Sequence, residues 1–186
     1  MNSIWQETGI APGREFVYAG EYCRAEGADG RAIIFHADTD TLEKNLLETA
    51  PQDKEPIMDF IRGIRMCSAF DFPSENEPLL TRIRKQIGTF FTFMKYGNEF
   101  RKWTKITGEE FASRFSDPLL RQVFREIWIP EFSMVFLFFT FAYLSKRNAG
   151  YPIGGSMPMS EALERRYREL GGVIHYNKRV ARILTN

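Results

Sequence analysis

The stretch Tyr151-Pro152-Ile153-Gly154-Gly155-Ser156 marks a change in the kind of sequence that the chain carries. Before it, hydrophobic residues recur mostly at the three- and four-residue spacing of amphipathic helices. After it, residues 157–170 have the pattern of one more helix, and residues 173–176 and 179–184 have the short apolar runs of β-strands. Two consecutive glycines permit unusual backbone angles and close backbone approach. The stretch therefore predicts a turn at which one part of the fold ends and another begins.

The residues before this stretch predict a β-hairpin and then a helical lobe. Residues 16–23 alternate loosely, residues 32–36 form a second apolar run, and Asp29-Gly30 lies in the turn between them. Six or more helices follow. Apolar spacing and start signals place them around residues 40–50, 57–64, 80–94, 117–127 and 132–144, with one more beginning at Thr107. The expected fold class is therefore α+β, mainly helical, with a small β-element at the start and a helix with strands at the end.

Three of these helices carry recognisable start signals. Asp40 with Glu43 and Thr107 with Glu110 have the spacing of capping boxes. Asp117 followed by Pro118 predicts an N-cap with proline at the first helical position. In the longest helix, one apolar stripe runs through Leu80, Ile83, Ile87, Phe90, Phe91 and Met94.

The composition limits the classes of function. A net charge of +1 gives no reason to expect a nucleic-acid partner. Cys23 and Cys67 form no disulfide framework, and with His36 and His175 they form no metal-ligand spacing. The N-terminus has no signal-peptide pattern, and the apolar run over residues 132–144 is shorter than the about 20 residues of a membrane span. We expect a cytoplasmic protein whose 17 Phe residues mainly fill a core.

The order of several short phrases resembles the phytoene-desaturase-like branch of the FAD-dependent amine oxidase and desaturase superfamily. The resemblance covers nearly all of the chain, although each phrase alone is unspecific. The phrases are Trp5-Gln6-Glu7-Thr8-Gly9, Asp29-Gly30, Asp40 through Pro51-Gln52-Asp53, Phe115-Ser116-Asp117-Pro118-Leu119-Leu120-Arg121, and Tyr151-Pro152-Ile153-Gly154-Gly155 with Gly171-Gly172-Val173-Ile174 and Val180-Ala181-Arg182-Ile183 after it.

The resemblance implies a substrate-binding domain at residues 1–150 and a returning, incomplete segment of an FAD-binding domain at residues 151–186. It implies that the parent enzyme transfers a hydride between FAD and an apolar substrate of the carotenoid, retinoid or lipid type, as a desaturase or saturase. The glycine-rich phosphate-binding turn of such enzymes is expected upstream of Met1. The chain is then an internal segment of a larger flavoprotein, and the rest of that protein is its partner. Taken alone it is expected to be inactive and to hold no FAD.

The resemblance also assigns roles to a few positions. Val180 matches the strand whose backbone meets the adenine of FAD, and Gly154 with Gly155 matches the glycines where the chain returns to the FAD domain. Tyr151 and Pro152 are expected near the mouth of the substrate cavity. No catalytic residue is identified, because Glu131, the nearest candidate, reads as a solvated carboxylate at a helix start.

Two other classes of function stay open. The chain could be a stand-alone helical lobe that binds a lipid or isoprenoid without catalysis. It could also contact a membrane surface, because basic and aromatic residues alternate in one region. These residues are Lys95, Arg101, Lys102 and Lys105, with Tyr96, Phe100 and Trp103.

Overall fold

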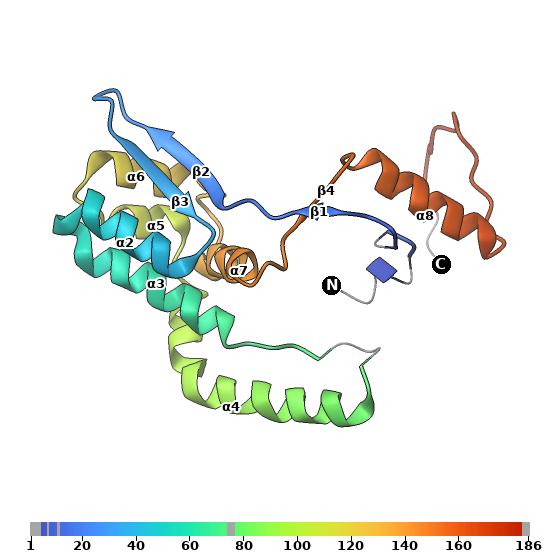
Figure 1. Cartoon of the computed structure of the whole chain (residues 1–186), viewed down its shortest axis with the longest axis horizontal. Coiled ribbons are helices and arrows are strands. Elements are labelled where there is room, and N and C mark those ends of the chain that lie inside the picture. The colour runs from blue at the N-terminus through green and yellow to red at the C-terminus, as the bar shows by residue number, and fades with distance from the viewer. Residues whose placement is uncertain (1–4, 7, 11, 74–76, 184–186) are drawn as a thin grey trace. The chain divides into compact units, whose positions relative to one another are not determined.

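The computed structural model describes residues 5–183 apart from 7, 11 and 74–76 (Figure 1). It is 55% helical and has two small two-stranded antiparallel sheets among the described residues, which confirms the α+β class. The chain forms two compact units, the first made of Met1–Phe16 with Pro152–Asn186 and the second of Val17–Tyr151. The chain passes between these units in β1 (Phe16–Val17) and again in β4 (Tyr151–Pro152), and these two short strands pair with each other.

The predicted hairpin is present in the second unit. Strand β2 (Glu21–Glu26) pairs with β3 (Ala32–His36) in antiparallel register, with Glu26 opposite Ala32. Gly30 in the turn has φ +80°, a conformation that glycine adopts without strain. The first strand of the hairpin, β2, begins at Glu21, later than the predicted residue 16, where the separate strand β1 lies. Ile33 and Phe35 of β3 are completely buried.

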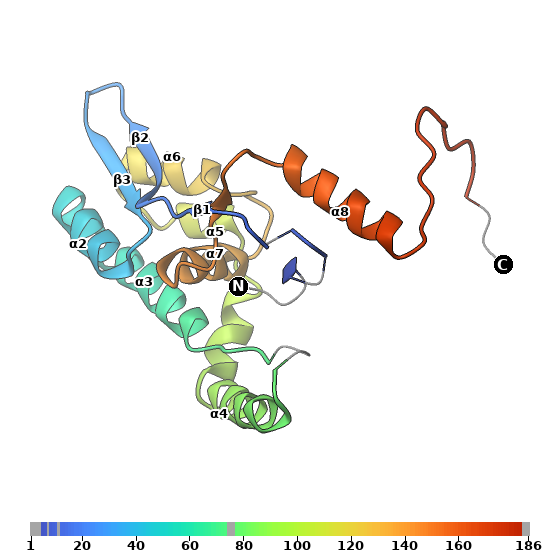
Figure 2. The same cartoon turned by 45° about the vertical axis from the view of Figure 1, so that its right-hand side comes forward.

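The helical lobe follows the hairpin (Figure 2). Its helices are α2 (Thr39–Thr49), the 3₁₀ turn η1 (Pro51–Asp53), α3 (Lys54–Ser68), α4 (Leu79–Trp103), α5 (Gly108–Ala112), α6 (Pro118–Glu126) and α7 (Met134–Ser145). The capping box at Thr107 and the Asp117 cap with Pro118 in the first turn are confirmed. The cap predicted at Asp40 is wrong. The cap is Asp38, whose Oδ1 accepts from the backbone N–H of Thr41 over 2.8 Å, because α2 begins at Thr39.

Phenylalanine fills the core of the lobe. Seven rings are at most 1% exposed, and they are Phe35, Phe60, Phe111, Phe115, Phe124, Phe138 and Phe141. The Phe60 ring meets the Phe124 ring edge to face at 4.9 Å, and the Phe115 ring stacks on the Phe124 ring at 4.5 Å. Both are favourable aromatic geometries. These rings pack against one another and against aliphatic neighbours, so this part of the interior is filled core.

Helix α4 is amphipathic as predicted, but its apolar stripe faces solvent. Leu80 is 81% exposed, Met94 is 69% exposed, and Phe90 and Phe91 are each 61% exposed. The helix is attached to the lobe mainly through its C-terminal half. There the Trp103 ring is buried against the rings of Phe111 and Phe138. The stripe is therefore not part of the core of this lobe.

The first unit consists of the N-terminal segment and α8 (Met157–Glu169). Arg14 ties them together, because its Nε donates to the Ile10 carbonyl at 2.7 Å and its Nη2 to the Pro158 carbonyl at 2.8 Å. Ala162 of α8 is 1% exposed. Gly171 ends the helix with φ +87°.

The strands predicted after α8 are not formed. Residues 173–183 contain no strand, and Leu184 lies outside the described residues. The apolar residues Val173 and Ile183 are 65% and 81% exposed. A strand needs a neighbour for its backbone groups. Asn177, with φ +55°, lies in the turn between the two predicted strands. A short apolar run was therefore not sufficient to make a strand here.

Candidate functional site

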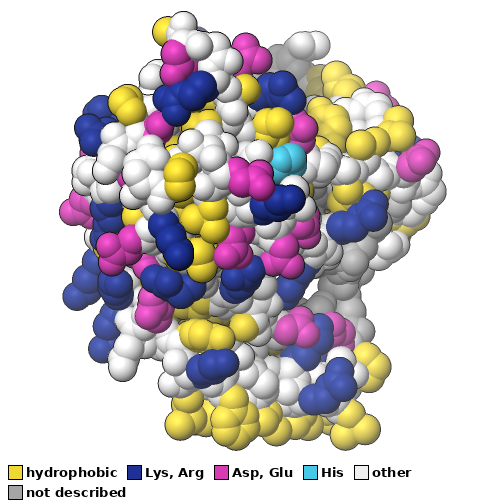
Figure 3. All heavy atoms as spheres, turned by 60° about the vertical axis from the view of Figure 1, so that its left-hand side comes forward, with side chains coloured by type: hydrophobic (Ala, Val, Ile, Leu, Met, Phe, Trp, Pro, Cys, Tyr) yellow, Lys and Arg dark blue, Asp and Glu magenta, His cyan; other side chains and the backbone are white. Residues whose placement is uncertain are grey.

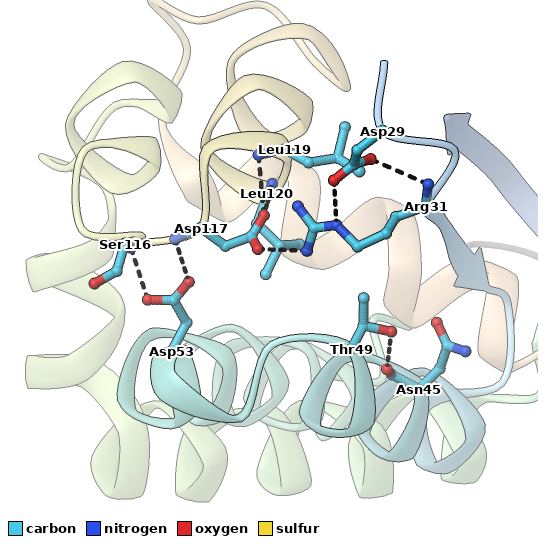
Figure 4. A network of polar contacts seen from close by, with 9 residues as sticks. All are labelled: Asp29, Arg31, Asn45, Thr49, Asp53, Ser116, Asp117, Leu119 and Leu120. Carbon is cyan, nitrogen blue, oxygen red and sulfur yellow. Dashed lines mark hydrogen bonds and ion pairs between the residues drawn. The ribbon is translucent and has the colours of Figure 1, made fainter. Parts of the chain in front are cut away.

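A network of buried and exposed polar groups joins the hairpin, η1 and the start of α6 (Figure 4). Asp53, 2% exposed, accepts from the backbone N–H groups of Ser116 at 2.7 Å and Asp117 at 2.8 Å. Asp117, 4% exposed, accepts through Oδ1 from the backbone N–H groups of Leu119 and Leu120, at 2.9 and 3.0 Å. Two carboxylates in succession thus fix the loop that leads into α6.

Arg31 connects this loop to the hairpin. Its Nη1 donates to Oδ2 of Asp117 at 2.8 Å, and its Nε donates to Oδ2 of Asp29 at 2.6 Å. Burial by itself raises the pKa of the Asp117 carboxyl. The hydrogen bond and charge of Arg31, with the backbone N–H groups of Leu120 and Leu119, outweigh burial, so the net pKa lies below the ordinary value. Asp117 is thereby held as a carboxylate.

The network contains one residue from each of three sequence phrases that carry the family resemblance. Asp29 belongs to the hairpin phrase, Asp53 to the proline-x-aspartate phrase, and Asp117 to the phrase before α6. Both oxygens of Asp53 and of Asp117 already accept hydrogen bonds from the protein. These carboxylates are therefore structural: they brace a turn and cap a helix, and neither oxygen pair is directed at a substrate.

In the Tyr151–Ser156 stretch, Tyr151 and Pro152 form β4, and residues 153–156 form the turn between β4 and α8. Gly154 has φ +92° and Gly155 has φ +77°, so both require glycine. The N–H of Gly155 donates to the Pro152 carbonyl at 3.1 Å, and the N–H of Ile153 donates to the Glu15 carbonyl at 2.9 Å. Backbone hydrogen bonds therefore hold this turn, which lies where the sequence predicts that one part of the fold ends and another begins.

The predicted substrate and cofactor residues are not gathered around one cavity. Tyr151 is 70% exposed and Pro152 is buried. Val180, predicted to meet the adenine of FAD, is 74% exposed and lies outside any strand. Two hollows open on the helical lobe instead, and neither is lined by these residues. The cofactor and substrate assignments of these positions stay predictions.

The two hollows are shallow, and the sequence pattern did not predict them. One has a volume of about 540 Å³ on the C-terminal half of α4 and is lined by Phe93, Met94, Gly97, Asn98, Phe100, Arg101 and Thr104. The other, of about 500 Å³, lies between β2 and α6 and is lined by Tyr22, Cys23, Ala25, Val123, Glu126 and Ile127. Both linings are mixed in polarity, and neither contains a nucleophile paired with a base.

The largest unexplained feature is the surface of α4. Figure 3 shows hydrophobic side chains gathered along the lower edge of the molecule, where α4 lies, with Lys and Arg side chains beside them. We define the α4 apolar face as the residues that are 43% to 81% exposed on its outer side, namely Leu79, Leu80, Ile83, Ile87, Phe90, Phe91 and Met94. The apolar spacing of this helix was evident in the sequence, but not the side that it faces.

The basic and aromatic residues singled out from the sequence form no single surface. Trp103 is buried, and Tyr96 and Phe100 are half-buried, so these rings belong to the inner side of α4. Lys95 and Lys102 are exposed. The exposed aromatic surface is made by Phe90 and Phe91 instead.

No family model, curated protein or solved structure matches this chain. The described residues contain no group of three or more His, Cys, Asp or Glu side chains placed to hold a metal ion. Among the same residues, no helix has both the length and the apolar character needed to cross a membrane.

Proposed function

We propose that the chain is part of an FAD-dependent oxidoreductase of the phytoene-desaturase-like type, acting on an elongated apolar molecule such as a polyene. In this proposal Val17–Tyr151 is the substrate lobe, and Pro152–Asn186 belongs to the flavin domain. The observation that carries it is the chain path: the lobe is one uninterrupted insertion between two segments that form a separate unit. The phrase order in the sequence and the glycine turn at the return point both support this assignment.

In this proposal the FAD site is completed by other parts of the parent protein. An adenine contact through Val180 needs an extended strand with a free edge, and this segment has no strand. Bound in the parent protein, the flavin would itself accept the hydride from the substrate. The part assigned to this chain is to provide an apolar surface for the substrate and to exclude water.

The test uses the protein translated from the full natural reading frame that contains this chain. We expect it to purify with bound FAD, and an elongated polyene substrate to change the flavin spectrum under anaerobic conditions. A full-length protein that holds no flavin after refolding with excess FAD would overturn the proposal. So would one bound flavin per molecule in the 186-residue chain alone, because the flavin site would then lie within it.

A second candidate is a stand-alone lobe that binds a lipid or isoprenoid without catalysis. The hollow between β2 and α6 favours it, since Tyr22, Val123 and Ile127 supply the apolar part of its wall. Titration of a fluorescent polyene fatty acid into the chain distinguishes the candidates. Saturable binding that is lost in Val123→Asp, together with a flavin-free full-length protein, would favour this second function.

A further inference from the structure

The residues of the α4 apolar face form one continuous stripe. From Leu80 the stripe passes through Ile83, Ile87, Phe90, Phe91 and Met94, in steps of three, four, three, one and three residues. At 3.6 residues per turn these positions stay within one side of the helix. Phe90 and Phe91 lie near its centre with their rings 5.9 Å apart. The stripe therefore runs along about four turns of the helix as one continuous apolar surface, which single exposed apolar residues would not form.

Cations border this stripe. Arg84, Lys95 and Lys102 are spaced by eleven and seven residues, close to three and two whole turns, so they line up along one flank. All three are exposed, and no ion pair joins them to an acid in the described part of the chain. Residues 79–98 contain no Asp or Glu at all. An apolar stripe with a cationic flank is the arrangement of helices that lie in a membrane interface.

The opposite side of α4 is fastened to the lobe. The Phe70 ring meets the Phe93 ring at 4.9 Å and the Phe100 ring at 5.6 Å. Lys85 forms ion pairs with Asp71 at 3.2 Å and Glu77 at 2.7 Å, so this cation is used within the lobe. The Ser133 hydroxyl donates to the Trp103 carbonyl at 2.9 Å. Because the inner side is occupied by these contacts, the α4 apolar face is directed outward.

We infer that α4 lies flat on an anionic lipid bilayer, with the α4 apolar face inserted among the acyl chains and Arg84, Lys95 and Lys102 at the lipid phosphates. The helix is 25 residues long, but it is not apolar enough to cross a bilayer. Charge favours lipid over a second copy of the chain. A second copy would bring the same three cations and one acid of α4, Glu99, which already accepts a hydrogen bond from Trp103 Nε1, whereas an anionic surface attracts all three cations. This inference does not depend on flavin chemistry.

The test is co-sedimentation of the purified chain with vesicles of phosphatidylcholine alone and of phosphatidylcholine with phosphatidylserine. We expect binding to the anionic vesicles that weakens with added salt. Replacing Phe90 and Phe91 together by Ala should lower the partition coefficient at least about tenfold, since each ring loses its apolar insertion. Replacing Lys95 and Lys102 together by Gln should weaken binding to anionic vesicles about thirtyfold and leave binding to neutral vesicles unchanged.

The matched control is the double replacement of Phe132 and Phe136 by Ala. These rings are also exposed, at 44% and 55%, and lie 5.7 Å apart, but Phe132 precedes α7 and Phe136 lies in its first turn. The control should bind vesicles like the wild type. Circular dichroism and thermal melting should show that each variant is folded.

Four results would overturn the inference. The first is equal loss of binding in the Phe132/Phe136 control, and the second is unchanged binding in the Phe90/Phe91 variant. The third is a wild-type dimer that binds no vesicles and becomes monomeric in the Phe90/Phe91 variant, which would assign the face to a second copy. The fourth is a monomer that binds no vesicles and loses thermal stability in that variant, which would mean that another part of this chain covers the face.

Discussion

Arg31 and Asp117 are 86 residues apart in the sequence, and Arg31 Nη1 donates to Asp117 Oδ2 at 2.8 Å. The bond joins the turn of the β2–β3 hairpin to the first turn of α6. Asp53 adds a second constraint on the same loop, from η1. Three parts of the lobe that are distant in sequence are thus held by two carboxylates and one guanidinium, and their removal should be felt in the stability of the whole lobe.

Asp117→Ala should destabilise the chain by about 2 kcal/mol, because it removes the N-cap of α6 and leaves the N–H groups of Leu119 and Leu120 without their acceptor. Asp117→Asn is the matched control. Asparagine caps helices about as well as aspartate, so this variant should lose less than about 1 kcal/mol. Urea denaturation followed by circular dichroism measures both. Equal losses in the two variants would mean that the charge, and not the cap, is what matters.

The stability contributed by the Asp117 charge should depend on pH in one direction. The pKa of this carboxyl is lowered in the folded chain, so its contribution is present above the ordinary Asp pKa of about 3.9 and is lost as the pH falls through the folded value. The stability difference between wild type and Asp117→Asn should therefore shrink below about pH 4. Denaturation midpoints between about pH 7 and about pH 3 test this, and a constant difference would contradict it.

The sequence predicted local features where one residue type has one strong role. Thr107 was predicted as an N-cap because a glutamate follows it by three residues, which is the spacing of a capping box. Asp117 was predicted as an N-cap because a proline, which is favoured at the first helical position, follows it directly. The cap of α2 was misplaced because Asp38 and Asp40 are both suitable, and only the path of the chain out of β3 selects Asp38. The fold class followed from apolar spacing alone.

Features that depend on a neighbour were not predictable. The spacing of α4 identifies an apolar stripe but says nothing of which side packs on the lobe, and that is decided by Phe70, Phe100 and Trp103. The runs around Val173 and Val180 have strand-like composition, yet no strand adjoins them in the described part of this chain. The polar network joins residues up to 86 positions apart, so spacing could not reveal it.

The two cysteines should differ in reactivity. Burial raises the pKa of the Cys67 thiol to about 12, and it also raises the pKa of Cys23, which is only half-buried. The thiolate is the reactive form, so Cys23 should react slowly with a disulfide reagent and Cys67 only after unfolding. Mass spectrometry of the native chain should find one modified thiol, and Cys23→Ser should show none. A modified Cys67 in the folded variant would contradict the packing of α3.

Gly63 and Gly88 give a matched pair of glycine-to-alanine replacements within helices. Gly63 lies in α3 against the Phe138 ring, and a Cβ added there would clash with three of its carbon atoms. The ring is completely buried and is held by the rings of Phe60 at 5.8 Å and Trp103 at 5.1 Å, so it has little freedom to move. Gly88 lies in α4, where an added Cβ meets no described atom within 4 Å.

Gly88→Ala should therefore stabilise the chain by up to about 1 kcal/mol, through the higher helix propensity of alanine. Gly63→Ala gains the same propensity, but overpacking against Phe138 should make the net effect a loss of about 1–2 kcal/mol. Adding Phe138→Leu should relieve the clash, so the double variant should be more stable than the sum of the single losses predicts. Urea denaturation measures these variants beside the wild type. If Gly63→Ala were as stable as Gly88→Ala, the close packing of α3 on α7 would be wrong.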